Sequence, residues 1–353
     1  MTMCYILSNF NKGGAKMRSI QLGKTGITVP QNAFGALPIQ RVSVDEAVSL
    51  LRNAYDGGMR FFDTARAYTD SEEKVGKAFY GMRDKVFISS KTQATTKEKF
   101  EEDLNTTLTN LKTDYLDIYQ LHCAAKCYNE EDDIYNCLVE AKKQGKVRHI
   151  GITAHKIGVA EDIVNSGLYE TLQFPFSYLA SERDIELVRS CNEHDMGFIA
   201  MKGLSGGLLT DYKACMAFMS QYDVLPIWGI QKQTELDEWL SFFDNEVTLT
   251  DDMKAVIEKD RNELLGEFCR GCGYCMPCTV DIRINQCARM SQMIRRAPSK
   301  NWLTDYWKEE MLKIDSCVDC GICKTRCPYE LDIPNLLKKN LKDYKEILDG
   351  KPV

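Results

Sequence analysis

The chain has 353 residues, 44% of them hydrophobic and 27% charged, so it can bury a barrel-sized core and a smaller one beside it. Its formal net charge of −6 at pH 7 offers no positive surface to a nucleic acid, and no apolar run approaches the stretch of about 20 residues that a membrane helix needs. These properties argue against nucleic-acid partners and a membrane span and are typical of a cytoplasmic globular protein.

Residues 1–17 differ in character from the rest of the chain. The run Lys12-Gly13-Gly14 precedes a later methionine, Met17, and the codons of Lys-Gly-Gly can spell a ribosome-binding sequence at a suitable distance from it. We therefore expect residues 1–17 to be a disordered tail or an extension upstream of the true start.

From residue 18 onward, short β-branched or aromatic runs alternate with amphipathic helical patterns. The runs Arg18–Leu22 and Ile27–Pro30 flank a turn with two glycines and predict a β-hairpin. Eight further runs predict strands: Asn32–Gly35, Arg60–Phe62, Val86–Ser89, Leu116–Leu121, Val147–Ile152, Thr171–Phe174, Gly197–Ala200 and Val224–Ile227. Helical patterns such as Val44–Asp56 and Lys97–Leu111 lie between them.

This alternation over residues 18–245 predicts a (β/α)8 barrel of the TIM-barrel class. Such a barrel carries its active site at the carboxyl ends of its strands. A doubly wound sheet is the alternative, and the lack of a Gly-x-Gly-x-x-Gly run after an early strand disfavours it.

Four polar residues follow three successive predicted strands. Asp63 and Tyr68 come after the second strand, Lys91 after the third and His122 after the fourth. Carbonyl reduction by hydride needs a proton donor at the developing alkoxide, and a phenol with a pKa of about 10 donates reluctantly. Lys91 would lower the pKa of Tyr68, and Asp63 would hold Lys91 in place. His122 would orient the carbonyl, so the set predicts a reductase site, although each residue alone has an ordinary structural explanation.

The runs Phe62–Tyr68, Ser89–Lys91 and Tyr119–His122 resemble, in their order and spacing, the motifs of the aldo-keto reductase family. The resemblance implies a catalytic set of Asp63, Tyr68, Lys91 and His122. It also implies a small carbonyl or alcohol substrate and a cofactor, NADPH or NADH, that lies extended across the barrel mouth.

The resemblance further implies which positions bind this cofactor. Thr153 and Gln173 would hold the nicotinamide, the loop 202–207 the pyrophosphate and the segment Gly229–Glu238 the adenosine, with Lys232 as a contact to a 2′-phosphate. The full set of implied positions is Gly35, Ala36, Asp63, Thr153, Gln173, Lys202, Gly203, Leu204, Gly206, Gly229, Lys232 and Glu238.

Three positions depart from the family pattern and leave the choice between NADP and NAD open. Met201 stands where many members have an aromatic residue, Ala154 replaces an amide and Trp239 replaces an adenine-contacting asparagine. The other histidines fit no ligand pattern and are expected to be structural or on the surface: His149, His155 and His194. Cys123 is adjacent to His122 and is expected to pack, or to face the pocket.

The cysteines point to iron–sulfur clusters. Eight lie in two tight runs near the carboxyl end, in each of which three cysteines recur at every third residue. Such thiolates can bind three corners of a cubane, and in two-cluster ferredoxins the fourth cysteine serves the other cluster. One 4Fe-4S cluster is therefore assigned to Cys269, Cys272, Cys275 and Cys327. The second is assigned to Cys317, Cys320, Cys323 and Cys278.

Zinc is the alternative metal for these cysteines. Zinc sites usually separate two cysteine pairs by a longer loop and need no third cysteine at the same step, which favours the clusters. In a large acidic chain, metal thiolates of this kind indicate a reducing cytoplasm and an oxygen-poor setting.

The carboxyl-terminal part reads as a second domain. Residues 246–265 predict a connecting helix, within which Thr250–Leu265 is amphipathic, and residues 266–353 predict a mainly α-helical ferredoxin-like domain. Its expected helices are Ile282–Ile294, Trp302–Leu312 and the lysine-rich Ile333–Leu348. Cys287 within the first of them is expected to be buried and inert.

Three functional hypotheses follow. The first is an NAD(P)H-dependent carbonyl reductase or alcohol dehydrogenase with Tyr68 as general acid and base, whose clusters serve structure, regulation or electron exchange with a ferredoxin or flavoprotein partner. The alternative is an iron–sulfur electron-transfer component of a larger redox complex, in which the barrel is a cofactor-binding scaffold. A third possibility is an oxygen-sensing module.

Overall fold

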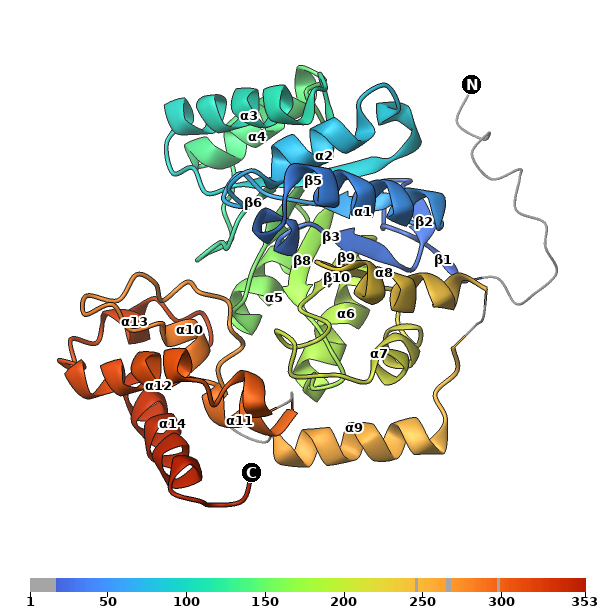
Figure 1. Ribbon diagram of the computed structural model, residues 1–353. Coiled ribbons are helices and arrows are strands. Elements are labelled where there is room, and N and C mark those ends of the chain that lie inside the picture. The colour runs from blue at the N-terminus through green and yellow to red at the C-terminus, as the bar shows by residue number, and fades with distance from the viewer. Residues whose placement is uncertain (1–16, 245–246, 265–267, 297–298) are drawn as a thin grey trace.

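The computed structural model describes residues 17–244, 247–264, 268–296 and 299–353. Eight parallel strands close into a barrel in the order β10-β3-β4-β5-β6-β7-β8-β9 (Figure 1). They are β3 (Ala33–Gly35), β4 (Phe61–Asp63), β5 (Phe87–Thr92), β6 (Leu116–Leu121), β7 (Val147–Thr153), β8 (Thr171–Pro175), β9 (Gly197–Met201) and β10 (Leu225–Gly229). The predicted barrel is confirmed, while the expectation for residues 1–16 lies outside the described residues.

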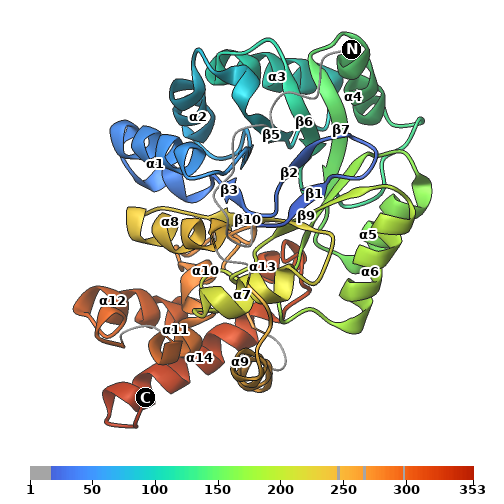
Figure 2. The same ribbon diagram turned by 90° about the vertical axis from the view of Figure 1, so that its right-hand side faces the viewer.

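The helices of the barrel surround these strands (Figure 2). They are α1 (Val44–Asp56), α2 (Ser71–Phe79), α3 (Lys97–Leu111), α4 (Asp133–Lys143), α5 (Ile157–Ser166), α6 (Glu182–Glu193), α7 (Tyr212–Met219) and α8 (Gln233–Leu240). Both α1 and α3 have the predicted bounds, because Ser43 and Thr96 cap their first turns with side-chain oxygens that accept backbone hydrogen bonds.

The predicted hairpin, β1 (Ser19–Gln21) and β2 (Thr28–Pro30), closes one end of the barrel. Its apolar side chains form a cluster with the side chains that fill the interior of the barrel: Ile20, Leu22, Ile27, Val29, Ala33, Phe61, Ile118, Ile199, Met201, Leu225 and Ile227. Because the hairpin covers the amino ends of the strands, functional side chains are presented at the carboxyl ends.

A connecting helix, α9 (Asp251–Glu263), leads to the second domain. This domain contains α10 (Ile284–Cys287), α11 (Met290–Arg296), α12 (Asp305–Leu312), α13 (Ile322–Thr325) and α14 (Ile333–Leu348) around its own small core. The predicted helix Ile282–Ile294 is wrong as a single element. It breaks at Ala288 and Arg289, where the Arg289 side chain turns to the barrel and donates a 2.7 Å hydrogen bond to the carbonyl of Gly206.

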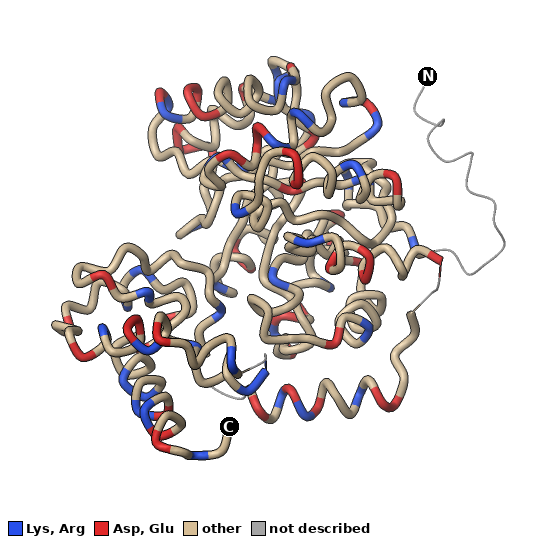
Figure 3. Tube along the Cα trace, in the orientation of Figure 1, with Lys and Arg blue, Asp and Glu red and all other residues tan. Residues whose placement is uncertain are grey.

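The lysines of α14 recur along the helix (Figure 3) and are exposed. Lys338 and Lys345 form ion pairs with Asp319 and Asp315 at 2.8 and 2.9 Å, so part of this charge is neutralised within the domain. In the described part of the chain, no helix is both long enough and apolar enough to cross a membrane.

Candidate active site and cluster-binding cysteines

The structure brings the four predicted catalytic residues together at the barrel mouth. Asp63 ends β4, Tyr68 follows it, Lys91 lies within β5 and His122 directly follows β6. The ammonium of Lys91 is 2.6 Å from Asp63 Oδ2 and donates a second hydrogen bond, also 2.6 Å, to the carbonyl of Thr64. Burial raises the pKa of the Asp63 carboxyl, and the neighbouring Lys91 opposes that rise.

Tyr68 lies between this ion pair and His122. Its ring centroid is 5.3 Å from Lys91 Nζ and 5.8 Å from the imidazole. Burial raises the pKa of Tyr68 well above its usual value, and Asp63 and Cys123 add to the rise. The net pKa shift of Tyr68 is thus opposite to the lowering expected from Lys91, because burial and the charge of Asp63 outweigh the charge of the ammonium. The phenol therefore retains its proton.

His122 is neutral in this environment. Burial, reinforced by the cations of Lys91 and Lys202, lowers its pKa to about 3. Its Nδ1 is buried and has no hydrogen-bond partner among the described residues. A neutral imidazole beside a protonated phenol is an arrangement that can bind a carbonyl oxygen through two donors.

The two predicted nicotinamide contacts lie at the mouth but already have protein partners. Thr153 Oγ1 accepts a 2.7 Å hydrogen bond from the backbone of Cys123, which fixes the loop after β6. Gln173 Oε1 accepts a 2.8 Å bond from Gln120, and its amide nitrogen is 3.8 Å from the sulfur of Met201. These residues therefore shape the mouth whether or not a cofactor contacts them.

The predicted positions on β3 and β10 form the neighbouring edge of the mouth. Gly35 pairs with Gly229 across these strands, and a Cβ atom on Gly35 would lie 3.1 Å from the carbonyl oxygen of Trp228. The backbone of Ala36 donates a 2.8 Å hydrogen bond to the carbonyl of Asp63. Close backbone approach thus explains Gly35 without a cofactor.

The predicted pyrophosphate loop contacts the second domain. A Cβ atom on Gly206 would lie 2.4 Å from the carbonyl oxygen of Arg270, and one on Gly203 would meet the ring of Trp228 at 2.5 Å. Leu204 is half-buried against the barrel core. Part of this glycine loop is therefore packed against protein, so less of the loop is exposed to a ligand than the sequence suggests.

The predicted adenosine segment is partly occupied by its own side chains. Glu235 Oε2 accepts hydrogen bonds from the backbone of Gln231 and Lys232 at 2.7 and 3.1 Å, which fills the amino end of α8. The side chains of Lys232 and Glu238 are exposed. Trp239 is fully buried and stacks on Trp228 at 3.8 Å, so it belongs to the core.

Two tyrosines of the second domain enter the barrel mouth, which the sequence does not predict. Tyr274 lies between the predicted ligands Cys272 and Cys275, and its hydroxyl accepts a 2.8 Å hydrogen bond from the thiol of Cys123. Tyr329 accepts a 2.8 Å bond from Lys202. No spacing rule reveals these contacts, since each joins residues from different domains.

His155 is also part of this junction. It is buried, its Nε2 is 3.1 Å from Lys202 Nζ, and its ring packs on both tyrosines. His155 is thus a structural residue, as expected, and it also lies beside the barrel mouth. His149 bonds Glu170 at 2.7 Å and His194 is exposed, as expected.

The predicted ligands of the first cluster lie near one another. Burial and the thiols of Cys269, Cys272 and Cys327 raise the pKa of Cys275 to about 12. In the described ranges, no three His, Cys, Asp or Glu side chains converge on a single-ion position. In a cubane each thiolate binds a different iron atom, so its ligands stand further apart.

The predicted ligands of the second cluster line one small cavity, which Pro277, Thr279, Val318 and Leu337 help to enclose. Five cysteines line it: Cys278, Cys317, Cys320 and Cys323 of the predicted second set, and Cys275 of the first. The hydroxyl of Thr279 is 3.7 Å from Cys320 Sγ and could bond a thiolate there. The four thiols of the predicted second set, with Cys278 contributed by the other run, fit the donor set of a 4Fe-4S cluster.

Two family models match the chain. The aldo/keto reductase family model matches residues 31–220, which is more than half of the chain, and the 4Fe-4S dicluster domain model matches residues 268–332. The latter supports iron–sulfur clusters over the zinc alternative.

Curated relatives and solved structures agree with the first match. The uncharacterized oxidoreductase YqkF of Bacillus subtilis is 27% identical over 209 residues, 55% of this chain and 67% of that protein. The aldo-keto reductase YhdN of the same organism is 28% identical over 213 residues, 55% of this chain and 64% of that protein. The chain thus spans about two thirds of the length of these relatives. An aldo-keto reductase from Klebsiella pneumoniae, solved in complex with NADPH, is 21% identical and superimposes with a TM-score of 0.60 over 69% of this chain and 95% of its own.

Proposed function

Because the chain belongs to the aldo/keto reductase family, we propose that it is an NAD(P)H-dependent oxidoreductase that interconverts carbonyl and alcohol groups. Tyr68 is its general acid and base. The observation that carries this proposal is the geometry of Asp63, Tyr68, Lys91 and His122, which lie on three neighbouring strand ends at the only end of the barrel that the hairpin leaves open.

In the proposed reaction, the protonated phenol of Tyr68 donates its proton to the carbonyl oxygen as the oxygen becomes an alkoxide. Neutral His122 donates a hydrogen bond to the same oxygen and orients the substrate. Lys91, held by Asp63 at 2.6 Å, places a positive charge near the phenol and favours the tyrosinate that remains after transfer. A bound nicotinamide supplies the hydride.

The cofactor would extend from Gln173 across Lys202 and the glycine loop toward Gly229. NADPH in the Klebsiella pneumoniae protein supports a nicotinamide dinucleotide of this kind. Since Glu235 uses the amides at the amino end of α8, a 2′-phosphate would depend on the exposed side chain of Lys232 alone. The proposed cofactor is therefore NADPH or NADH.

Two 4Fe-4S clusters are proposed in the second domain, one on Cys269, Cys272, Cys275 and Cys327, the other on Cys278, Cys317, Cys320 and Cys323. Such clusters transfer one electron at a time, which suits exchange with a ferredoxin or flavoprotein. Thiolate-bound clusters also favour a reducing location such as the cytoplasm.

The alternative, an electron-transfer component of a larger complex, is favoured by one observation. Tyr274 and Tyr329 carry the segments around the first set of cysteines into the barrel mouth. A ligand in the barrel would therefore lie close to that cluster.

The test is turnover of carbonyl substrates with NADPH and NADH by anaerobically purified protein and its Tyr68→Phe variant. The reductase proposal predicts a fall in kcat of about 10²- to 10⁴-fold, the usual contribution of a general acid. Tyr80→Phe, at an exposed tyrosine, serves as control and should keep full activity. Equal turnover by wild type and Tyr68→Phe would overturn the proposal. If Tyr68→Phe loses turnover with NAD(P)H but its reduced clusters still pass electrons to an acceptor, carbonyl reduction and electron transfer are separable activities.

A further inference from the structure

Tyr274 of the second domain reaches the proposed active site of the barrel. Its hydroxyl accepts a 2.8 Å hydrogen bond from the thiol of Cys123, the residue that directly follows His122. The ring centroids of His122 and Tyr68 are 5.8 Å apart. Burial raises the pKa of Tyr274, and Cys123 and Tyr68 add to the rise, so the two phenols lie within range of each other's charge. Tyr274 is therefore a neighbour of the proposed proton donor.

The segment that carries Tyr274 is held against the barrel at a second place. Arg289 donates a 2.7 Å hydrogen bond to the carbonyl of Gly206, in the loop after β9. A Cβ atom on Gly206 would lie 2.4 Å from the carbonyl oxygen of Arg270, and one on Gly271 would lie 2.4 Å from the guanidinium of Arg289. Such close packing leaves the segment little room to shift. The position of the Tyr274 ring is thus set by the contact between the two domains.

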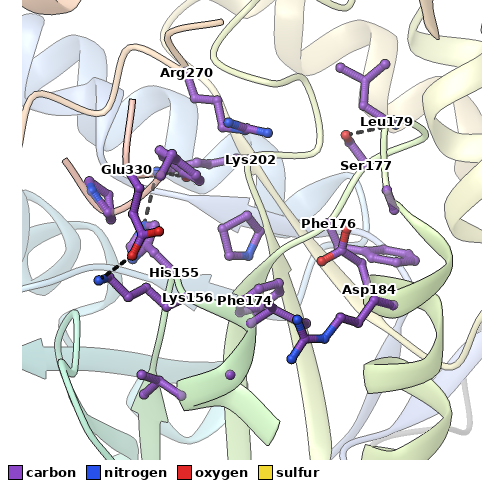
Figure 4. Close-up of a pocket in the computed structure, with 18 of the residues that line it drawn as sticks. His155, Lys156, Phe174, Phe176, Ser177, Leu179, Asp184, Lys202, Arg270 and Glu330 are labelled. Atoms are coloured by element: carbon purple, nitrogen blue, oxygen red, sulfur yellow. Dashed lines mark hydrogen bonds and ion pairs between the residues drawn. The ribbon is translucent and has the colours of Figure 1, made fainter. Parts of the chain in front are cut away.

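On the other side of the ring lies a cavity of about 680 Å³ between the domains (Figure 4). His155 and Lys202 line this cavity, and both are close to Tyr274. The two ring centroids are 5.1 Å apart, and Lys202 Nζ is 5.5 Å from the centroid of the tyrosine. Neither Tyr68 nor Cys123 is among the described residues that line the cavity. The ring of Tyr274 therefore separates the proposed catalytic residues from this space.

We propose that Tyr274 determines which carbonyl compounds the site accepts, because its ring closes the substrate pocket on the side of the second domain. The inference rests on the proposed function, since it takes the substrate carbonyl to lie between Tyr68 and His122. A substituent of the carbonyl carbon that points toward Cys123 meets the ring of Tyr274 beside it. The substrates are accordingly aldehydes and ketones with a short chain on this side, and a fused aromatic group would overlap with the phenol.

The closing ring belongs to the segment that would bind the first cluster. Tyr274 lies between the predicted ligands Cys272 and Cys275. The second domain therefore completes the substrate pocket of the barrel. This role requires no electron transfer between the clusters and the barrel, and it gives the fusion of the two domains a function in substrate selection.

The first measurement compares kcat/KM for propanal and for 2-naphthaldehyde, with NADPH or NADH and anaerobic holoprotein. In Tyr274→Ala, the preference for propanal should fall by at least about tenfold, the effect of relieving the overlap in an overpacked site. Tyr274→Phe keeps the ring and loses only the hydrogen bond with Cys123, so it should keep the wild-type preference. Tyr306→Ala, at an exposed tyrosine of the same domain, is the control and should keep it as well.

The second measurement needs no turnover. Cys123 is alkylated with N-methylmaleimide and with the much larger N-(1-pyrenyl)maleimide, and peptide mass spectrometry gives the rate of each reaction. The small reagent should react faster in wild type, and Tyr274→Ala should lower the ratio of the two rates by at least about tenfold. Tyr274→Phe should keep the wild-type ratio. Iron content and circular dichroism check each variant, and Tyr274→Leu replaces Tyr274→Ala if the latter loses iron or fails to fold.

An unchanged alkylation ratio in the folded Ala or Leu variant would overturn the proposal, and so would an unchanged substrate preference in such a variant that turns over. Equal changes in Tyr274→Phe and Tyr274→Ala would also overturn it, because the hydrogen bond and not the ring would then set the limit. If no form of the protein reduces either aldehyde, the proposed function fails. The alkylation ratio still decides in that case whether Tyr274 closes the site.

Discussion

The thiol of Cys123 donates a 2.8 Å hydrogen bond to the hydroxyl of Tyr274. The first residue directly follows His122 at the barrel mouth, and the second lies between two predicted cluster ligands of the second domain. The bond therefore joins the proposed catalytic region to the predicted cluster-binding region. Burial raises the pKa of the Cys123 thiol, so it remains protonated and able to donate.

Removing Tyr274 should open the mouth. In Tyr274→Ala, Cys123 loses its hydrogen-bond acceptor and the ring that covers it. Its alkylation by iodoacetamide, followed by peptide mass spectrometry, should be about tenfold or more faster than in wild type. That factor corresponds to the loss of about one or two kcal/mol of protection. Tyr306→Ala, at an exposed tyrosine of the same domain, is the control. An unchanged alkylation rate in Tyr274→Ala would show that Tyr274 does not cover Cys123.

The buried pair of Lys91 and Asp63 should be important for stability. Lys91→Met leaves the Asp63 carboxylate without its partner and should lower the free energy of local opening by about 3–5 kcal/mol at pH 7. Burial already raises the pKa of Asp63, so protonation at lower pH should reduce this loss. Hydrogen exchange of peptides covering β4 and β5, measured at pH 7 and pH 5, gives both values. The double variant Asp63→Asn, Lys91→Met should lose less stability than Lys91→Met, because no buried carboxylate is left unpaired. An equal loss of stability in the single and the double variant would contradict this explanation.

His122 should reduce stability in acid. Its folded pKa of about 3 lies below the usual 6.5, so the unfolded chain takes up the proton first and stability falls as the pH drops from about 6.5 toward 3. The slope is at most about 1.4 kcal/mol per pH unit from this one group. Unfolding by urea between pH 7 and pH 4.5 should show a smaller slope in His122→Asn than in wild type. The exposed His194→Asn should keep the wild-type slope, and equal slopes in all three would argue against a neutral His122.

The assignment of Cys278, a cysteine of the first run, to the second cluster can be tested by iron content. Cys278→Ala should lose the second cluster although it lies in the first run, reducing iron from about eight to about four atoms per chain while the first cluster keeps its EPR signal. Cys137→Ala, at a cysteine of α4 in the barrel, should keep all the iron. Loss of the first cluster's signal in Cys278→Ala would show that each run binds its own cluster.

Much of the barrel and of the catalytic set could be predicted because both depend on local patterns. Strand and helix periodicity locates the elements, and residues at consecutive strand ends of a closed barrel must meet, as Asp63, Lys91 and His122 do. The ends of helices are predicted less accurately, as Thr304 shows. Its side chain accepts a hydrogen bond from Trp307 and starts α12 later than the predicted Trp302.

Contacts between the domains could not be predicted in this way. Lys202 and Tyr329 meet only because the second domain packs on the barrel, and no sequence separation encodes that contact. The pKa of Tyr68 was also predicted with the wrong sign, because a motif specifies that a lysine is near but not how far burial and Asp63 offset its charge.

The most direct test of the central claim follows the hydride itself. Anaerobic single-turnover reactions with [4-²H]NADPH or [4-²H]NADH and a carbonyl substrate should place deuterium on the carbinol carbon of the alcohol in wild type, and Tyr68→Phe should slow this transfer by about 10²-fold or more. Deuterium-free alcohol formed at the expense of reduced clusters, or undiminished transfer in Tyr68→Phe, would contradict the assignment of Tyr68 as the proton donor in a hydride-transferring barrel.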